Sequence, residues 1–195
     1  GTTIGGSPVG RHGTASVLSF NGNKVVTTGG GGAVLTDDDA FSVQVRHLTT
    51  TAKRPHRWEF QHDQVAYNYR MPNINAALGC AQLERLDDFV ERKRILTERY
   101  QRAFSNVQGI RLHTERDGTR SNYWLQALIL QSDLESYRDP LLTALNDAGL
   151  QSRPAWHPMH LLPFNADCPR TDLSVTEAIS RRLINIPSSP SLVNV

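Results

Sequence analysis

The chain has 195 residues and a mass of 21.7 kDa, with 38% hydrophobic residues, 21% charged residues and a formal net charge of +2. This composition is too apolar and too close to neutral for a disordered chain, and its weak, dispersed basicity argues against a nucleic-acid partner. The sequence has no run of about 18 apolar residues, so no membrane-spanning segment is expected.

Cysteine usage and the first residues bear on the compartment. Cys80 and Cys168 are far apart and form no CxxC motif, which argues against a disulfide framework and against a thiolate zinc site. No basic and apolar leader opens the chain, so a cytoplasmic location is expected. The chain starts with Gly1 in a segment that reads as a loop. We therefore expect a fragment of a longer protein.

The first half predicts strands, a glycine-rich turn and two helices. Three short apolar runs come first, at residues 17–20, 25–28 and 33–36, with Asn-Gly after the first and four glycines after the second. This pattern predicts a strand–loop–strand unit. Asp37 to Asp39 predict the start of a helix that runs to about Leu48. Residues 49–63 read as an ordered polar loop, and residues 73–104 as one long helix, apolar first and charged later.

The second half predicts a small α+β domain. The expected elements are a strand at 123–130, a helix at 137–148 ended by Gly149, an extended segment at 151–155, a loop rich in Pro and His at 157–169, a helix at 175–183 and a strand at 184–186. A long helix of this kind commonly links two domains. The predicted domains are therefore residues 1–100 and residues 101–195.

Lysine is rare, since only Lys24, Lys53 and Lys93 occur among 21 basic residues. Lys53 lies in a polar loop and Lys93 in a charged helical stretch, so both are expected to be solvated. Lys24 lies between two apolar runs, where an Asn-Gly turn could lift it into a cleft. A desolvated lysine has a lowered pKa, and its neutral amine can form a Schiff base. Spacing alone favours the simpler interpretation, a lysine in a hairpin turn.

Four stretches carry a resemblance to a known family. They are SFNGNK at 19–24 with the glycine run after it, NYRMPNINAALG at 68–79, RPAWHPMH at 153–160 and LINIPSSP at 183–190. Together they strongly resemble the DegT/DnrJ/EryC1/StrS family of sugar aminotransferases, which use pyridoxal phosphate. The SFNGNK stretch is similar to the subgroup that makes UDP-linked 4-amino-4,6-dideoxy sugars of the legionaminic acid type. The resemblance covers almost the whole chain.

The resemblance implies an α/β fold, that of the fold-type-I pyridoxal-phosphate transferases. The chain would hold the end of the large domain and the small C-terminal α+β domain. Lys24 would hold the cofactor as an imine and shuttle the proton. Ser19 would hydrogen-bond the cofactor phosphate, and Asn68 would reach the phosphate in the other subunit of a homodimer with shared active sites. Arg70 would support that contact or form a salt bridge at a helix start, and Asn21 stands where many relatives have His.

The resemblance also implies the substrates, a nucleotide sugar and an amino-acid donor, glutamate. Its substrate loop suggests four substrate-binding residues: Arg153, Trp156, His157 and His160. Packing alone is the alternative for each, and Trp156 is the residue to test against a nucleotide. A zinc site is disfavoured, because two histidines three apart have no third ligand.

Two hypotheses on function remain at this point. In the first, an aminotransferase moves the amino group to the 4-keto carbon of a nucleotide-linked deoxy sugar. The family's Asp that pairs with the pyridine nitrogen lies upstream of Gly1 in relatives, so the isolated chain is expected to be inactive. In the second, the chain is a non-catalytic dimerisation or interaction module of the same fold. A dehydratase of the family would have His in place of Lys24, which argues against that activity.

Overall fold

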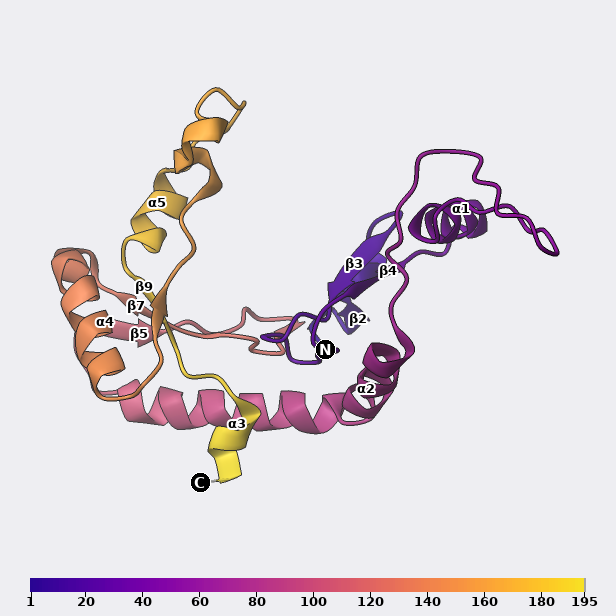
Figure 1. Ribbon diagram of the computed structural model, residues 1–195. Helices are drawn as coiled ribbons and strands as arrows, with labels where there is room; N and C mark the ends of the chain where they lie inside the picture. The colour runs from indigo at the N-terminus through magenta and orange to yellow at the C-terminus, as the bar shows by residue number, and fades with distance from the viewer. Residues whose placement is uncertain (195) are drawn as a thin grey trace. The chain divides into compact units, whose positions relative to one another are not determined.

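The computed structural model describes residues 1–194 and divides into two compact units (Figure 1). The first comprises Gly1–Asp88 with Gly118–Arg120, and the second comprises Phe89–Asp117 with the residues from Ser121 onward. The division at Phe89 lies near the start of a helix, earlier than the expected boundary at residue 100. Within the described residues, no helix combines the length and apolarity needed to cross a bilayer.

The opening residues of the first unit form a hairpin, although the sequence suggested a loop. A three-stranded sheet has the order β2–β1–β6, from β1 (Thr3–Ile4), β2 (Ser7–Pro8) and β6 (Thr119–Arg120). Gly5 and Gly6 connect β1 to β2 with φ values of +55° and +79°, which glycine adopts without strain. This Gly-Gly pair is a hairpin signal that the sequence interpretation missed. A 3-10 turn, η1 (Val9–Arg11), follows.

The predicted strand–loop–strand unit is present. β3 (Ser16–Ser19) pairs antiparallel with β4 (Gly32–Leu35). Residues 25–28, the second of the three apolar runs, lie in the connecting loop. Phe20 N–H donates to the Gly31 carbonyl at 2.9 Å, and Thr28 N–H donates to the Phe20 carbonyl at 3.0 Å. These two bonds join the start of the loop, at Phe20, to its later residues Thr28 and Gly31.

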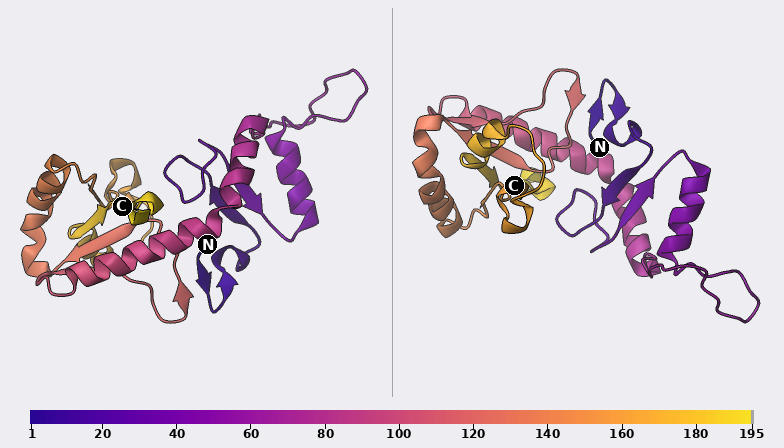
Figure 2. Two further views of the ribbon diagram at one scale, coloured as in Figure 1. Left: turned by 90° about the horizontal axis from the view of Figure 1, so that it is seen from below. Right: turned by 90° about the horizontal axis from the view of Figure 1, so that it is seen from above.

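The helices of the first unit follow the sequence signals only in part. α1 (Asp39–Thr49) begins as predicted, with the Asp38 carboxylate accepting from Phe41 N–H at 3.0 Å. The predicted single helix at 73–104 is two helices, α2 (Asn73–Leu83) and α3 (Leu86–Phe104). Leu83 is 51% exposed, so the apolar stripe does not continue across the break. Figure 2 shows the long connection between α1 and α2 projecting from this unit.

The second unit has an antiparallel sheet with the order β5–β7–β9–β8. Its strands are β5 (Ile110–Leu112), β7 (Gln126–Leu130), β8 (Arg153–Pro154) and β9 (Leu183–Ile186). Leu128 pairs with both Leu112 and Ile184, so these side chains share one face and form the core with Leu130 and Ile186. Aromatic residues of α3 and leucines of α4 (Arg138–Asp147) pack against this core.

The remaining elements of the second unit are short. They are η2 (Ser132–Tyr137), η3 (Met159–Leu161), η4 (Pro163–Asn165), α5 (Ser174–Ser180) and η5 (Pro190–Asn194). Gly149, with φ of +79°, ends α4 as predicted, and its N–H donates to the Asn146 carbonyl at 2.9 Å. The strand expected at 123–130 starts only at Gln126, because Tyr123 has φ of +42° and interrupts the extended chain. β5 had not been expected.

Candidate active site

Lys24 lies in the loop between β3 and β4, in a half-buried position. Its N–H donates to the Asn21 carbonyl at 3.0 Å, and the Asn21 side-chain amide donates to the Asn23 carboxamide oxygen at 3.2 Å. Lys24 therefore follows a hydrogen-bonded turn, as the simpler interpretation expected. The half-buried position is also compatible with an amine that faces a ligand.

Buried residues just after Lys24 anchor this loop. Val26 and Thr28 are 8% and 1% exposed. The Thr27 hydroxyl donates to the Phe20 carbonyl at 3.0 Å, and Asn75 in α2 donates to the Thr28 carbonyl at 2.5 Å. These bonds tie Thr27 and Thr28, shortly after Lys24, to Phe20 and to α2.

Gly79 in α2 allows the loop and the helix to approach closely. A Cβ atom at Gly79 would lie 2.9 Å from the Thr28 Cγ2 atom, closer than real Cβ contacts. Gly79 is the buried residue of α2. The position of the lysine loop therefore depends on a residue without a side chain in the NYRMPNINAALG stretch.

Ser19 ends β3 opposite Gly32 and is exposed. Its Oγ accepts from Asn21 N–H at 3.5 Å, which leaves the hydroxyl proton to donate to an anion. Gly31, with φ of +96°, lets the chain turn back toward β4, and a Cβ there would lie 3.1 Å from the Met71 methyl group. Ser19 and Lys24 thus lie at the start and the middle of one glycine-closed loop.

Asn68 belongs to a segment that runs beside the end of α1. It forms an isolated β-bridge with Thr50, and its own position is exposed. The neighbouring rings of Tyr67 and Tyr69 stack with centroids 5.0 Å apart. Arg70, also exposed, lines a hollow of about 740 Å³ with residues of the glycine run, β4 and α1. Neither Ser19 nor Lys24 lines this hollow.

Three of the four predicted substrate residues are exposed in the second unit. Arg153 lies in β8, and Trp156 and His157 follow it. Trp156 is 66% exposed as a residue, and its ring stacks on that of Trp124, with centroids 6.0 Å apart and planes 28° apart. One face of an indole therefore packs within the protein while much of the ring remains accessible.

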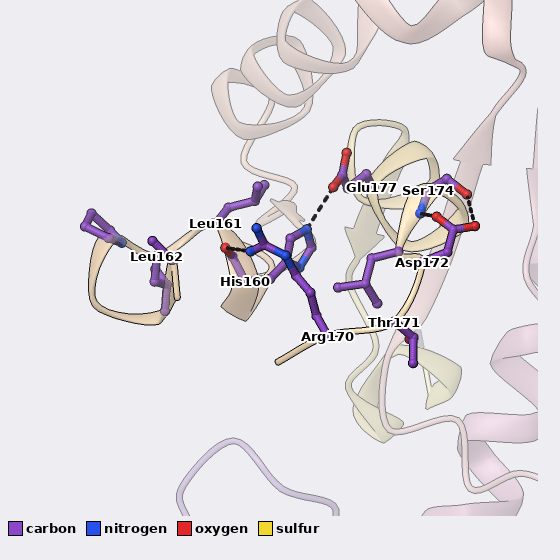
Figure 3. Close-up of a pocket in the computed structure, with 11 residues that line it drawn as sticks. His160, Leu161, Leu162, Arg170, Thr171, Asp172, Ser174 and Glu177 are labelled. Carbon is purple, nitrogen blue, oxygen red and sulfur yellow. Dashed lines mark hydrogen bonds and ion pairs between the residues drawn. The ribbon is translucent and has the colours of Figure 1, made fainter. Parts of the chain in front are cut away.

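His160 differs from the others, because its side chain is only 12% exposed. Its Nε2 atom lies 2.9 Å from a carboxylate oxygen of Glu177 in α5, and Arg170 donates to the His160 carbonyl at 3.2 Å. Figure 3 shows the ring directed at Glu177 along a hollow of about 580 Å³. In the described residues, no three His, Cys, Asp or Glu side chains are grouped to hold a metal ion.

Lys93 was predicted to be solvated, and that prediction was wrong. Its residue is 3% exposed, and its Nζ donates to the carbonyls of Trp124 at 3.1 Å and Ser188 at 2.5 Å. Burial lowers the pKa of its amine to about 8. Val90, Lys93 and Thr97 lie on one helical face and all are buried, but two of the three are polar, so their spacing does not mark this face as buried.

A sequence-family comparison identifies the chain. The model of the DegT/DnrJ/EryC1/StrS aminotransferase family matches residues 1–194. The chain belongs to this family. Its members are sugar aminotransferases that depend on pyridoxal phosphate, so the predicted family and cofactor class are confirmed.

Curated relatives of this family member include two GDP-perosamine synthases. That of Vibrio cholerae is 38% identical over 197 residues, covering 98% of this chain and 52% of the relative. That of Caulobacter vibrioides is 34% identical over 195 residues, with 98% and 52% covered. The chain thus spans about half the length of the curated relatives that it matches.

Solved structures support the predicted fold class. The aminotransferase TlmJ from Streptoalloteichus hindustanus is 26% identical, with a TM-score of 0.88 over 97% of this chain and 50% of that one. Helicobacter pylori PseC, an aminotransferase involved in pseudoaminic acid biosynthesis, has a TM-score of 0.91 at 20% identity. The match covers 98% of this chain and 52% of PseC. The second similarity concerns the fold alone.

Proposed function

We propose that this chain supplies the lysine of a pyridoxal-phosphate-dependent aminotransferase, which moves an amino group from glutamate to the 4-keto carbon of a nucleotide-linked deoxy sugar. One observation carries the proposal. Lys24 is held half-buried on an anchored loop, in a chain that matches this family from residue 1 to residue 194.

The residues around Lys24 fit the cofactor. The loop carries the amine of Lys24 and starts at Ser19, whose hydroxyl proton can donate to an anion, and a run of glycines closes it. Pyridoxal phosphate, when bound, supplies an electron sink for the carbon that loses a proton. Ser19 would donate to its phosphate. Asn68 would donate to the phosphate in the second subunit of a homodimer, where Arg70 would order the segment.

Lys24 would act as the general acid and base. Its Nζ would remove a proton from the carbon attached to the transferred nitrogen and return it to the neighbouring imine carbon. The bonds from Thr27 and Asn75 would restrict where the loop can place Nζ. Positioning of this kind lowers the entropic cost of each proton transfer.

The second unit would bind the nucleotide sugar. Trp156 offers an exposed ring face for a base, and Arg153 offers a guanidinium that can pair with a diphosphate. His157 is exposed and can face the sugar, whereas His160 would support the loop through Glu177. The curated relatives named above favour a GDP-linked sugar as the first candidate, and the SFNGNK stretch makes a UDP-linked sugar the second.

The test is replacement of Lys24 in the complete protein. Lys24→Ala should lower amino transfer from glutamate at least about 1,000-fold, with GDP-linked or UDP-linked 4-keto-6-deoxy sugar as acceptor and mass spectrometry of the product as readout. Lys53→Ala is the matched control, because Lys53 is exposed and lies over the Phe60 ring. Undiminished transfer by Lys24→Ala would show that another residue performs this role.

A second candidate is a non-catalytic dimerisation or interaction module of the same fold. The exposed apolar strands favour it, since Val17 and Leu35 are 77% and 48% exposed. Titration with pyridoxal phosphate separates the two functions. Binding that depends on Lys24 supports the enzyme, whereas self-association without cofactor binding supports the module.

A further inference from the structure

We propose that Lys93 is a positioning residue that fixes the Trp124 main chain, and thereby sets the plane of the Trp124–Trp156 stack. The role of this stack in binding a nucleobase rests on the proposed function. The fixing of the stack does not, because it follows from contacts within the second unit alone.

The first step is the environment of the ammonium group. Lys93 projects from α3, and its Nζ donates to two main-chain carbonyls, those of Trp124 and Ser188. The Ser188 hydroxyl also donates to the Trp124 carbonyl, at 3.0 Å. A triangle of three residues therefore joins α3, the segment before β7 and the segment after β9.

The second step is the place of this triangle in the sheet. The β7–β9 ladder ends where Gln126 pairs with Ile186. Continued in the same register, the ladder would place Trp124 opposite Ser188, with Pro187 between Ile186 and Ser188. In such a pair the two residues would exchange main-chain hydrogen bonds, but the Trp124 N–H donates to the Asn122 side chain. The Lys93 ammonium bridges the two carbonyls instead.

The third step is the cost of such a residue. A buried ammonium is unfavourable unless strong hydrogen bonds compensate it, and an apolar side chain of similar size would avoid the penalty. Burial lowers the pKa of Lys93, yet at about 8 the amine remains mainly protonated at neutral pH. A charged donor to two carbonyls makes stronger bonds than a neutral one. The buried ammonium therefore fixes the positions of the two carbonyls, although an apolar side chain would cost less free energy to bury.

The fourth step connects the carbonyl to the rings. Trp124 N–H donates to the Asn122 side chain at 3.1 Å, so both polar main-chain groups of Trp124 are engaged. A fixed main chain restricts the rotamers of the Trp124 ring. That ring forms the inner half of the stack with Trp156, whose own residue is 66% exposed. Without the lysine bridge, the Trp124 carbonyl would lose its charged donor, and the ring that supports Trp156 would be less restrained.

The test is Lys93→Met in the complete protein, with the circular-dichroism couplet of two stacked indoles as the readout. Trp156→Phe defines the signal that the pair contributes. Lys93→Met should lose at least half of that signal while the helical signal is retained, and Lys93→Arg, which keeps a charged donor, should restore most of it. A full couplet in Lys93→Met, or equal losses in the Met and Arg variants, overturns the proposal.

A second variant decides the matter if Lys93→Met does not fold. Ser188→Ala removes one of the two side-chain donors to the Trp124 carbonyl and leaves Lys93 in place. An unchanged couplet shows that Lys93 suffices to hold the carbonyl and supports the proposal, whereas a loss as large as that in Trp156→Phe assigns this role to Ser188 and overturns it. In the enzyme, Lys93→Met should raise the KM for the nucleotide sugar about tenfold with kcat within about twofold, as expected for lost binding. The couplet needs no substrate or cofactor, so it tests Lys93 even if the proposed function fails.

Discussion

The two units of the chain bury their apolar side chains very differently. In the second unit, the sheet gathers a core around Ile184, which is fully buried, under leucines of α4 and aromatic residues of α3. Among the described residues of the first unit, only Val26 and Ala52 are buried apolar residues, and Val17 is 77% exposed. The second unit is therefore held by an apolar core, whereas hydrogen bonds and a close helix contact hold the lysine loop of the first.

The largest expected effect comes from the core of the second unit. Ile184→Ala should lower the free energy of unfolding by about 3–4 kcal/mol, because it removes fully buried carbon atoms and leaves a cavity. Val26→Ala, its counterpart in the first unit, should cost about 1–2 kcal/mol. Urea unfolding followed by circular dichroism measures both. Equal losses would contradict the difference between the units.

Gly79→Ala tests the helix contact that holds the lysine loop. Its Cβ would press on Thr28, at a cost of about 1–3 kcal/mol, and the better helix propensity of alanine offsets about 1 kcal/mol. We expect a net loss of about 1 kcal/mol in the free energy of unfolding and a weaker affinity for pyridoxal phosphate. Gly22→Ala is the matched control, since an added methyl group there meets nothing within 4 Å. If the two variants have the same free energy of unfolding and the same affinity for pyridoxal phosphate, the contact at Gly79 does not hold the lysine loop.

Lys93 gives the second unit a specific pH dependence. Its pKa is about 8 in the folded protein and near the ordinary lysine value of 10.5 in the unfolded chain. Between these values the unfolded chain binds the proton and the folded protein does not, so the stability contribution of Lys93 rises with pH. It is lowest below pH 8, where both states are charged and burial of the charge is costly.

Comparison with Lys93→Met isolates this contribution. Other titratable groups of α3, such as Tyr100 and Arg94 with its partner Glu115, are present in both proteins. Urea unfolding at pH values from about 7 to 10 should show wild-type stability gaining on that of the variant as the pH rises through 8. A constant difference would mean that the amine is not buried in solution.

The smallest expected effect concerns the exposed strands of the first unit. Val17→Thr keeps a β-branched side chain on β3 and should change the free energy of unfolding by no more than about 0.5 kcal/mol. The same urea measurement applies. A loss as large as that of Val26→Ala would show that another surface covers β3 in solution.

Local signals in the sequence predicted the elements that depend on neighbouring residues. Asp38 caps α1, Gly149 ends α4, and the glycine run connects two paired strands, because capping and turn geometry are decided within a few residues. Of the missed elements, the β1–β2 hairpin has a local Gly-Gly signal, but others depend on distant partners. β6 is two residues long and pairs with β1, more than a hundred residues earlier in the chain. The break between α2 and α3 likewise depends on which face of each helix is buried.

The two lysines separate what the sequence alone determined from what the tertiary structure decided. Lys24 could be singled out by its motif, because its setting is a local turn with a characteristic order of residues. Lys93 could not, because the charged stretch around it is typical of a solvated helix face. Its partners lie 31 and 95 residues further along the chain, and only the folded sheet brings their carbonyls to one amine. Burial by distant segments is a property of the packing, which no local pattern contains.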